Sequence, residues 1–491
     1  RMSKKYTLSG NLTGNILSPR GFPQATLVLC PWQRVALLCM LILLVLWAIF
    51  DWRQELLVIN ILLTVFYLVA TLHRIFIIEL ALRKPTEINY TPEQLQRPPN
   101  GKEWPRYMVI LPMYHEGEVL PELIQGLKKL DYPKDRLEIR LLIEEDDEET
   151  RSVADKLQLE APFVVVLIPK SEPRTKPKAC NIGIEDGEAD YLVIYDAEDK
   201  PEPDQLKKAV WAFWDSPEEV ACIQAKLGYY NSDWNFLTRC FTAEYANWFG
   251  LCLPGLDRLQ APIPLGGTSN HFKLPVLRQL GGWDEYNVTE DCDLGLRLFI
   301  TGWRTRILES TTWEQACPSL PFWIRQRSRW VKGYIQTYLV HTRDLIGVHR
   351  KLGLWNSLQF HLFIGGTFFS QLINPIYWLL TISWLCLRPT GLEYFFPTPV
   401  FVMGSFCLFA GNFIFAYTSG IACVRRGVGH LAHYAVVMPI YWMLMSIGAW
   451  KGFLQLLTKP HHWEKTKHFA NENLVDNTDG TRTGHGRDTD N

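Results

Sequence analysis

Long apolar stretches without a charged side chain lie near both ends of the chain. Two of them, residues 35–50 and 56–72, are each close to the length of a helix that spans a bilayer. Only residues 51–55 separate them, so they predict a transmembrane hairpin over residues 35–87. Lysine and arginine residues flank this hairpin, which places its outer flanks, including the N-terminal segment 1–34, in the cytosol.

The C-terminal part repeats the apolar pattern. It contains three uncharged stretches, which predict a transmembrane region over residues 351–458 with three or four spans: 352–387, 397–424 and 427–450. The tail 459–491 is polar and poor in aromatic residues, which is typical of a disordered segment. The chain is therefore expected to be a multi-pass protein of the inner or plasma membrane.

Between the apolar ends, residues 88–350 alternate short β-rich runs with amphipathic helical patterns. The runs begin at positions 107, 139, 163, 191 and 220, and they are apolar throughout. Such alternation predicts βαβ units and a parallel sheet with helices on both faces, that is, a Rossmann-like α/β domain in the cytosol. Helices at about 320–350 are expected to lie at the membrane interface.

Composition narrows the classes of function. The 50 basic and 51 acidic residues nearly cancel, so no nucleic-acid partner is expected. The 11 cysteines contain no CxxC pair, which favours reduced structural thiols over a zinc site or a disulfide framework.

Carboxylates follow three of the predicted strands. The strand at 107 runs into the sequence YHEGE, the strand at 139 runs into EEDD, which includes Glu144 and Glu145, and the strand at 191 runs into DAED. Carboxyl ends of parallel strands meet at the edge where ligands bind. Asp196 and Glu198 could place two hard oxygen ligands on Mg²⁺ or Mn²⁺, and Lys178 with its neighbours Arg174 and Lys176 supplies positive charge near the same edge. The alternative is a solvated acidic loop.

A second acidic group opens a predicted helix. Thr289 has N-cap character, and Glu290, Asp291 and Asp293 occupy the first turn. Acidic side chains at that place stabilise the helix dipole, so a structural role is sufficient to explain them. The same placement also presents a carboxylate that could act as a general base.

A basic and aromatic stretch, QRSRW, precedes the C-terminal apolar region. It contains Gln326, Arg327, Arg329 and Trp330. Arginine and tryptophan also populate membrane interfaces, so an anchoring belt explains the stretch taken alone as well as a binding site does.

The order of these motifs resembles the processive family 2 glycosyltransferases of the cellulose, curdlan and hyaluronan synthase type. Strand-end acids, DAED, TED and QRSRW follow one another over residues 100–335, and membrane helices flank them. The resemblance implies a GT-A-type catalytic domain inserted between transmembrane helices. Two departures from the family pattern are DAED in place of D-x-D, which leaves the second metal ligand open between Glu198 and Asp199, and EEDD in place of D-D.

The resemblance also implies roles for single residues. Asp291 would deprotonate the acceptor hydroxyl, and Asp196 with Glu198 would hold the divalent metal on the donor diphosphate. The remaining substrate contacts would be Glu144 or Glu145 for the nucleotide base, Lys178 for the phosphates, Glu290 within the TED motif, Gln326 and Arg329 for the diphosphate or the acceptor end, and Trp330 for the terminal sugar.

The expected reaction is an inverting transfer without a covalent intermediate. The resemblance favours UDP-glucose as the donor and a β-glucan, of the cellulose type or β-1,3-linked, that is passed across the membrane as an exopolysaccharide. Expected partners are the nucleotide sugar, the growing glycan and the bilayer, with a homo-oligomer or accessory export proteins compatible with this function. The alternatives are a non-processive transferase acting on ceramide, diacylglycerol or a polyprenyl carrier, and an inactive transporter or scaffold.

Overall fold

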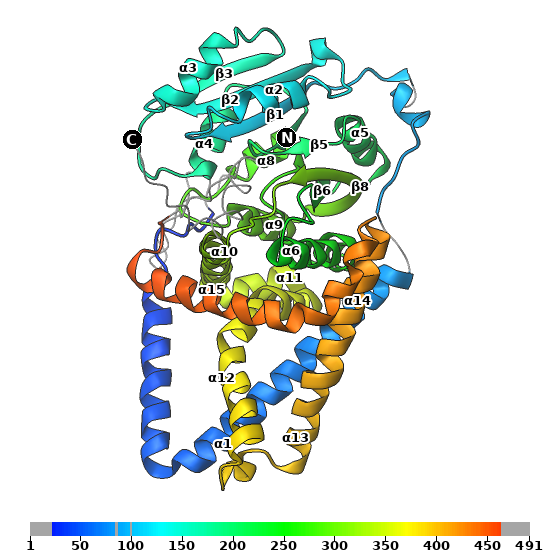
Figure 1. Cartoon of the computed structure of the whole chain (residues 1–491). Coiled ribbons are helices and arrows are strands. Elements are labelled where there is room, and N and C mark those ends of the chain that lie inside the picture. The colour runs from blue at the N-terminus through cyan, green and yellow to red at the C-terminus, as the bar shows by residue number, and fades with distance from the viewer. Residues whose placement is uncertain (1–21, 84–86, 99–100, 463–491) are drawn as a thin grey trace, which may run out of the picture.

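The computed structural model describes residues 22–83, 87–98 and 101–462. An α/β domain forms one end of the molecule, and α1 (Pro31–Arg83), α12 (Gly366–Leu387) and α13 (Thr398–Ser405) extend from it on the opposite side (Figure 1). Most of the predicted disordered tail and of the N-terminal segment lies outside the described residues.

The α/β domain is built on an eight-stranded sheet with the order β3-β2-β1-β4-β7-β6-β8-β5. Strands β1 to β4 are parallel, as predicted. The strand bounds are β1 Tyr107–Met113, β2 Leu137–Glu144, β3 Phe163–Ile168, β4 Tyr191–Ile194, β5 Lys200–Pro201, β6 Val220–Tyr229, β7 Asn270–Lys273 and β8 Arg304–Glu314.

The prediction of an entirely parallel sheet is wrong for the second half. Strand β7 runs antiparallel to both β4 and β6, β5 runs antiparallel to β8, and only β6 and β8 are parallel there. The reversal has a local cause, because the loop before β7 folds back onto the end of β4: the Ser269 N–H donates to the Ile194 carbonyl at 2.8 Å. The glycine-rich segment 266–267 therefore reaches the carboxyl end of β4.

Helices cover both faces of the parallel half. Neighbouring residues of β1 alternate between two hydrophobic clusters, with Met108 and Ile110 in one and Val109 and Leu111 in the other. Burial on both faces explains why these strands are continuously apolar. The covering helices are α2 (Leu120–Leu127), α3 (Glu148–Lys156), α4 (Lys176–Gly183) and α5 (Gln205–Asp215).

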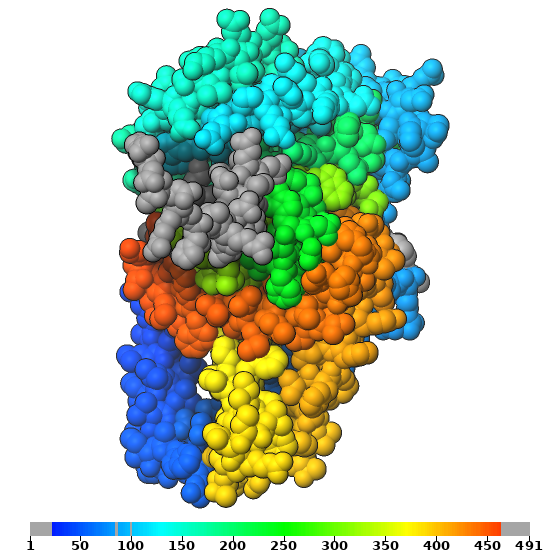
Figure 2. Space-filling view, viewed as in Figure 1, coloured from blue at the N-terminus to red at the C-terminus, as the bar shows by residue number. Residues whose placement is uncertain are grey.

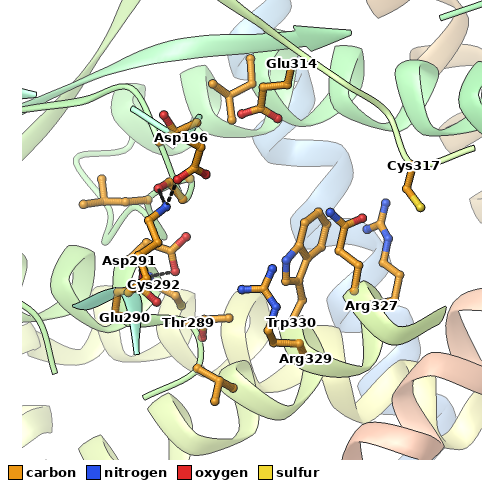
Figure 3. A pocket seen from close by; sticks show the side chains of 18 of the residues that line it. Asp196, Thr289, Glu290, Asp291, Cys292, Glu314, Cys317, Arg327, Arg329 and Trp330 are labelled. Atoms are coloured by element: carbon orange, nitrogen blue, oxygen red, sulfur yellow. Dashed lines mark hydrogen bonds and ion pairs between the residues drawn. The ribbon is translucent and has the colours of Figure 1, made fainter. Parts of the chain in front are cut away.

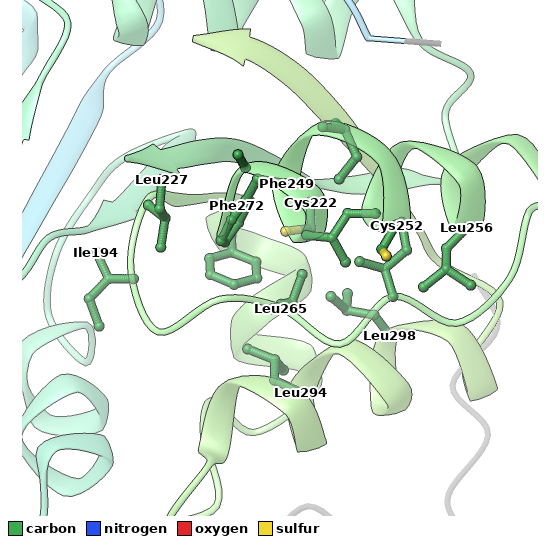
Figure 4. Packing of buried hydrophobic residues seen from close by; sticks show 14 of the residues in the cluster. Ile194, Cys222, Leu227, Phe249, Cys252, Leu256, Leu265, Phe272, Leu294 and Leu298 are labelled. Atoms are coloured by element: carbon green, nitrogen blue, oxygen red, sulfur yellow. The ribbon is translucent and has the colours of Figure 1, made fainter. Parts of the chain in front are cut away.

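A second part of the core fixes α9 (Glu290–Ile300) beneath the mixed half of the sheet. Leu294 and Leu298 of α9 lie opposite Leu265 and Phe272 (Figure 4). Gly295 allows the close approach, since a Cβ there would lie 2.2 Å from the Ile263 carbonyl oxygen. The head of α9 is thereby held at the edge of the sheet where the site lies.

The helices between and after the strands connect this domain to the apolar side. They are α6 (Phe236–Asn247), η4 (Trp248–Cys252), α7 (Leu253–Arg258), α8 (Leu274–Gln279), α10 (Leu320–His341), α11 (Leu345–Phe360), η6 (His361–Gly365), α14 (Asn412–Arg425) and α15 (Met438–Thr458). The predicted N-terminal hairpin corresponds to α1, whose two helical arms meet at a sharp kink at Asp51 (φ −156°, ψ 82°; Figure 1).

Within the part of the chain that the structure describes, three helical segments are long and apolar enough to cross a membrane: Pro31–Arg83, Thr398–Arg425 and Gly429–Thr458. The last of these includes α15, which lies crosswise above the end of α12 and reaches α14 (Figures 1 and 2). Helix α15 packs on α10, and Gly452 permits this contact because a Cβ there would lie 2.5 Å from the Ser328 carbonyl oxygen. The structure thus places the predicted span 427–450 largely alongside the α/β domain.

Candidate active site

A cavity of about 470 Å³ opens at the carboxyl end of the parallel strands, as the strand-end rule predicts. Its walls come from the ends of β1, β2 and β4, the glycine-rich loop before β7, the end of β8, the head of α9, and α10 and α12. Figure 3 shows carboxylates on one side and the arginines and tryptophan of α10 on the other.

The DAED turn after β4 presents two of its three carboxylates to the cavity. Asp196 and Glu198 line the cavity. Asp199 is buried behind them, where its Oδ2 accepts from the Asp196 N–H at 2.7 Å and from the Thr268 hydroxyl. Burial, and then the neighbouring carboxylates, raise the pKa of Asp199 well above its usual range. Asp199 therefore closes the turn, and Glu198 is the residue placed to share a metal with Asp196.

Two lysines of α4 have different surroundings. The Lys176 ammonium lies in the cavity, paired with Asp196 and donating to the Gly267 carbonyl at 2.9 Å. Burial opposes its charge, but Asp196 and Glu290 raise its pKa above the usual range. Lys178 is buried outside the cavity lining and donates to the Pro169 and Ser171 carbonyls, both at 3.1 Å. The cation placed to meet donor phosphates is thus Lys176, and Lys178 holds the backbone beneath it.

The EEDD segment after β2 divides in a similar way. Glu144 and Asp146 line the cavity, and Asp146 forms an ion pair with Arg174 at 2.8 Å. Glu145 is exposed and outside the lining. Asp147 caps α3 by accepting from the Thr150 N–H at 3.1 Å. Of the two predicted contacts to the nucleotide base, only Glu144 faces the cavity.

The TED motif places two carboxylates at the head of α9. Glu290 and Asp291 line the cavity, and Asp291 Oδ1 accepts from the Cys292 N–H at 2.7 Å. Burial raises the pKa of Asp291 to about 6, against the opposing effects of the Cys292 N–H, Lys176 and Arg329. Burial, together with Asp291, raises the pKa of Glu290 to about 7. Raised pKa values near neutrality suit a general base.

The third acid of the turn points away from the cavity. Asp293 binds Arg297 and His341, both at 2.7 Å, and so fastens α9 to α10. Thr289 stands at the N-cap position, but its side chain makes no capping hydrogen bond, contrary to the expectation from the sequence.

The head of α9 and the helix that carries QRSRW form one closely packed unit. The Gln336 side-chain oxygen accepts from the Val288 N–H at 3.2 Å, and Asn287 donates to Thr337 at 2.9 Å. Gly333 permits the helices to touch, because a Cβ there would lie 2.2 Å from Thr289 Oγ1. The distance between the TED carboxylates and α10 is therefore set by direct contact.

Three residues of QRSRW face the cavity from one side of α10. Gln326, Arg329 and Trp330 have the i, i+3, i+4 spacing that places side chains on one helix face. Arg329 lies near Glu290 and Asp291, and burial lowers its pKa despite their opposing effect. The ring centroid of Trp330 lies 6.1 Å from that of Phe241.

Arg327 also lines the cavity and holds this face of α10 in place through its contacts with α6 and α15. Its guanidinium forms a two-pronged ion pair with Glu244, with one contact at 2.8 Å, and it donates to the Tyr441 hydroxyl at 2.8 Å. It also lies 4.5 Å from the centroid of the Trp330 ring. The anchoring-belt explanation does not fit this part of α10, because Arg327 is buried and Gln326, Arg329 and Trp330 line a cavity.

Lys176 and Glu314 line the cavity, although neither was assigned a role in the site from the sequence. Lys176 lies in the same RTKPK sequence as Lys178, and the start of α4 decides which one faces inward. Glu314 ends β8 and lines the cavity. The rule that carboxylates at strand ends line the site would have identified Glu314. The polar sequence of β8, however, does not predict a strand there.

Sequence comparisons agree with this arrangement. The family described as Glycosyl transferase family group 2 matches residues 191–445, and Glycosyl transferase family 2 matches residues 108–273. The chain belongs to glycosyl transferase family group 2. The family part of the resemblance is thus confirmed, and the processive type within it stays a prediction.

Two curated relatives of this family 2 transferase illustrate its range. The probable glycosyltransferase YdaM of Bacillus subtilis (strain 168) is 26% identical over 315 residues, which cover 62% of this chain and 75% of YdaM. The probable glucomannan 4-beta-mannosyltransferase 10 of Arabidopsis thaliana is 27% identical over 286 residues, 56% of this chain and 51% of the plant protein.

A solved structure supports the fold. The mannosyltransferase PcManGT from Pyrobaculum calidifontis, in complex with GDP-Man and Mn²⁺, superposes with a TM-score of 0.50 at 17% identity, over 82% of this chain and 99% of that one. The GT-A-like fold of this family 2 transferase is therefore confirmed, with a mixed sheet in place of the predicted parallel one.

Proposed function

We propose that this chain is an inverting membrane hexosyltransferase that extends a β-linked glycan from a nucleotide-sugar donor. One observation carries the proposal: a single cavity joins the carboxylates and cation of the donor end to the aromatic face of Trp330, with Asp291 in the same space. A direct sugar transfer requires a binding site for the donor diphosphate, a base, and a surface on which the acceptor sugar packs.

The residues define the transfer step. The acceptor hydroxyl gives its proton to the Asp291 carboxylate and forms a bond to the anomeric carbon, while the bond from that carbon to the diphosphate oxygen breaks. The negative charge left on the diphosphate is met by Lys176 and Arg329, which line the cavity beside the carboxylates. Backside attack of this kind inverts the anomeric centre and needs no covalent intermediate.

The donor end also fits a divalent metal. Asp196 and Glu198 offer hard oxygen ligands from one turn, and Asp199 holds that turn in shape. Bound Mg²⁺ or Mn²⁺ would add positive charge at the diphosphate. The proposed role of Mn²⁺ is further supported by the complex of PcManGT with GDP-Man and Mn²⁺, which shares the fold.

The identity of the donor sugar and of the glycan product is also part of the proposal, because family membership alone does not specify them. UDP-glucose and a β-glucan stay predictions from the resemblance. The plant relative is named a glucomannan mannosyltransferase, and the archaeal structure holds GDP-Man, so GDP-mannose is the second donor that we propose to test.

The membrane arrangement belongs to the same proposal. We place the two arms of α1, together with α12 and the α13–α14 segment, across the bilayer, because apolar side chains cover their outer surfaces. Helix α15 would lie at the interface, and the α/β domain would face the cytosol, where nucleotide sugars are made. The cavity reaches Phe368 and Gln371 of α12, so an extended glycan would leave toward the membrane helices.

One feature favours a second candidate, a lipid glycosyltransferase. The membrane end of the cavity is apolar, with Phe368 of α12 and Met445 of α15 in its wall. An acyl or polyprenyl chain would fit against these side chains. The two candidates share donor, metal and base, and they differ in the length of the product.

Purified protein should be incubated with Mn²⁺ and either UDP-glucose or GDP-mannose. A polymer that linkage-specific glucanases or mannanases degrade would support the glycan synthase. A product of one sugar on an extractable lipid would support the second candidate. No release of nucleoside diphosphate from either donor would contradict both.

A further inference from the structure

Glu314 occupies a position in the cavity that the proposed mechanism does not use. It is the last residue of β8, and two neighbours fix its backbone: the Tyr230 N–H donates to the Glu314 carbonyl at 3.1 Å, and the preceding Trp313 pairs with Lys200 of β5. Side chains alternate along a strand. Trp313 accordingly points outward, and the Glu314 carboxyl group points into the cavity (Figure 3).

This carboxyl group is not held by protein partners. Within the described ranges of the chain, no hydrogen bond or ion pair is made by the Glu314 side chain. Carboxylates of the DAED turn repel it, and the ammonium group of Lys176 opposes their effect. A half-buried carboxylate in such surroundings costs folding free energy unless a ligand provides hydrogen bonds. The position therefore indicates a ligand contact rather than a structural role.

The opposite wall shows what kind of ligand fits. Trp330 turns its ring toward the cavity, and Gln326 lies one helical turn before it on the same face. The Gln326 side-chain oxygen is buried and accepts no hydrogen bond within the described residues. The cavity thus combines an aromatic face with two acceptor groups that lack protein donors.

A sugar ring matches this combination. A pyranose has an apolar C–H face that packs on an aromatic ring and a perimeter of hydroxyl donors. Diacylglycerol would offer one hydroxyl donor, and its acyl chains would leave the second acceptor group unsatisfied. The charge-assisted hydrogen bond from a hydroxyl to a carboxylate is among the stronger neutral-to-charged contacts.

We infer that Glu314 binds a hydroxyl group of the terminal sugar of a glycan acceptor, with that sugar packed on Trp330 and a second hydroxyl bound by Gln326. This inference rests on the proposed function and specifies the acceptor class. Glu314 would hold the sugar on the side away from α9, so that the reacting hydroxyl is directed to Asp291.

The test uses full-length protein in detergent with Mn²⁺, whichever of UDP-glucose and GDP-mannose the wild type turns over, and cellotetraose or mannotetraose as the acceptor. Glu314→Ala is expected to raise the acceptor KM about 10- to 100-fold, the effect of losing a hydrogen bond to a charged group. Donor hydrolysis without acceptor and the half-saturating Mn²⁺ concentration should stay at wild-type values. Glu314→Gln keeps hydrogen-bonding atoms at this position, so its acceptor KM should rise less than that of Glu314→Ala.

Two matched variants complete the experiment. Glu218→Gln removes a carboxylate from an exposed position after α5 and should change none of these quantities. Gln326→Ala should raise the acceptor KM as well. The double variant Glu314→Ala/Gln326→Ala should raise the acceptor KM by less than the product of the two single increases, because both residues hold one sugar.

Several results would overturn the inference. An unchanged acceptor KM in Glu314→Ala would show that the side chain does not touch the acceptor. A raised requirement for Mn²⁺ would make Glu314 a metal ligand instead. Failure of the proposed function would look different, since the wild type would then release no nucleoside diphosphate from either donor.

Discussion

Replacing Gly333 by alanine tests whether direct contact between α9 and α10 sets the geometry of the site. A Cβ at this position would lie 2.2 Å from Thr289 Oγ1, 2.5 Å from its Cγ2 and 2.7 Å from its Cβ. Carbon atoms in ordinary contact are about 3.5 to 4 Å apart. The two helices must therefore separate by roughly 1 Å to accept the methyl group.

This separation moves the TED carboxylates relative to Trp330 and Arg329. A misplacement of about 1 Å in a catalytic arrangement can cost about 10²-fold in rate, or roughly 2.7 kcal/mol. We expect Gly333→Ala to lower kcat by about this factor. The affinity for the donor should change less than kcat, because the DAED turn and Lys176 belong to other elements and only Arg329 of the proposed diphosphate contacts moves with α10.

The assay is the steady-state release of nucleoside diphosphate, with donor affinity measured separately by calorimetry. Gly126→Ala in α2 is the matched control, since a Cβ there meets no atom within 4 Å. Thr289→Ala removes the two closest atoms and should restore part of the activity of Gly333→Ala. The reasoning is refuted if Gly333→Ala has wild-type kcat, or if it is inactive and Thr289→Ala restores nothing.

The remaining predictions concern five other positions. Lys176→Met should weaken nucleotide binding measured by calorimetry, whereas Lys178→Met should lower the melting temperature and leave nucleotide affinity nearly unchanged; the reverse pattern would exchange their roles. Arg327→Met leaves Glu244 half-buried without its partner, so thermal unfolding in detergent should show a loss of about 3 kcal/mol, and a melting temperature equal to that of the wild type would contradict the ion pair's importance. Because the pKa of Asp291 is raised to about 6 and only the ionised carboxylate accepts a proton, kcat should fall as the pH drops through 6; a level profile down to pH 5 would exclude Asp291 as the base. EDTA should abolish turnover, and Mn²⁺ should restore it in the wild type but not in Asp196→Asn; full activity in EDTA would remove the metal from the mechanism.

The sequence predicted the parallel half of the fold because buried strands leave a strong pattern. The apolar runs at 107–113 and 163–168 have the bounds that the structure gives to β1 and β3. Strand β7 has only four residues, Asn270–Lys273, and β8 contains several polar side chains, so neither shows a strand pattern. The antiparallel half depends on backbone pairing between distant segments, which periodicity does not report.

The site was predictable to the level of motifs, because carboxyl ends of parallel strands converge at one edge. The direction of single side chains was not. Lys176 and Lys178 are two residues apart on one helix, and they therefore face different surroundings. Asp293 was expected beside Asp291, but it turns to His341 and Arg297. Hydropathy likewise gave the apolar character of α15 but not its crosswise direction, because that depends on packing against α10.

The central claim is that Asp291 is the base of an inverting sugar transfer, and Asp291→Asn tests it most directly. The purified variant and the wild type should be given the donor that the wild type turns over, with Mn²⁺, and both donor binding and nucleoside diphosphate release should be measured. We expect the variant to bind the donor as the wild type does and to release diphosphate at least about 10²-fold more slowly, while NMR of the wild-type product shows the anomeric configuration opposite to that of the donor. Turnover by Asp291→Asn near the wild-type rate, or a product with retained configuration, would contradict the claim.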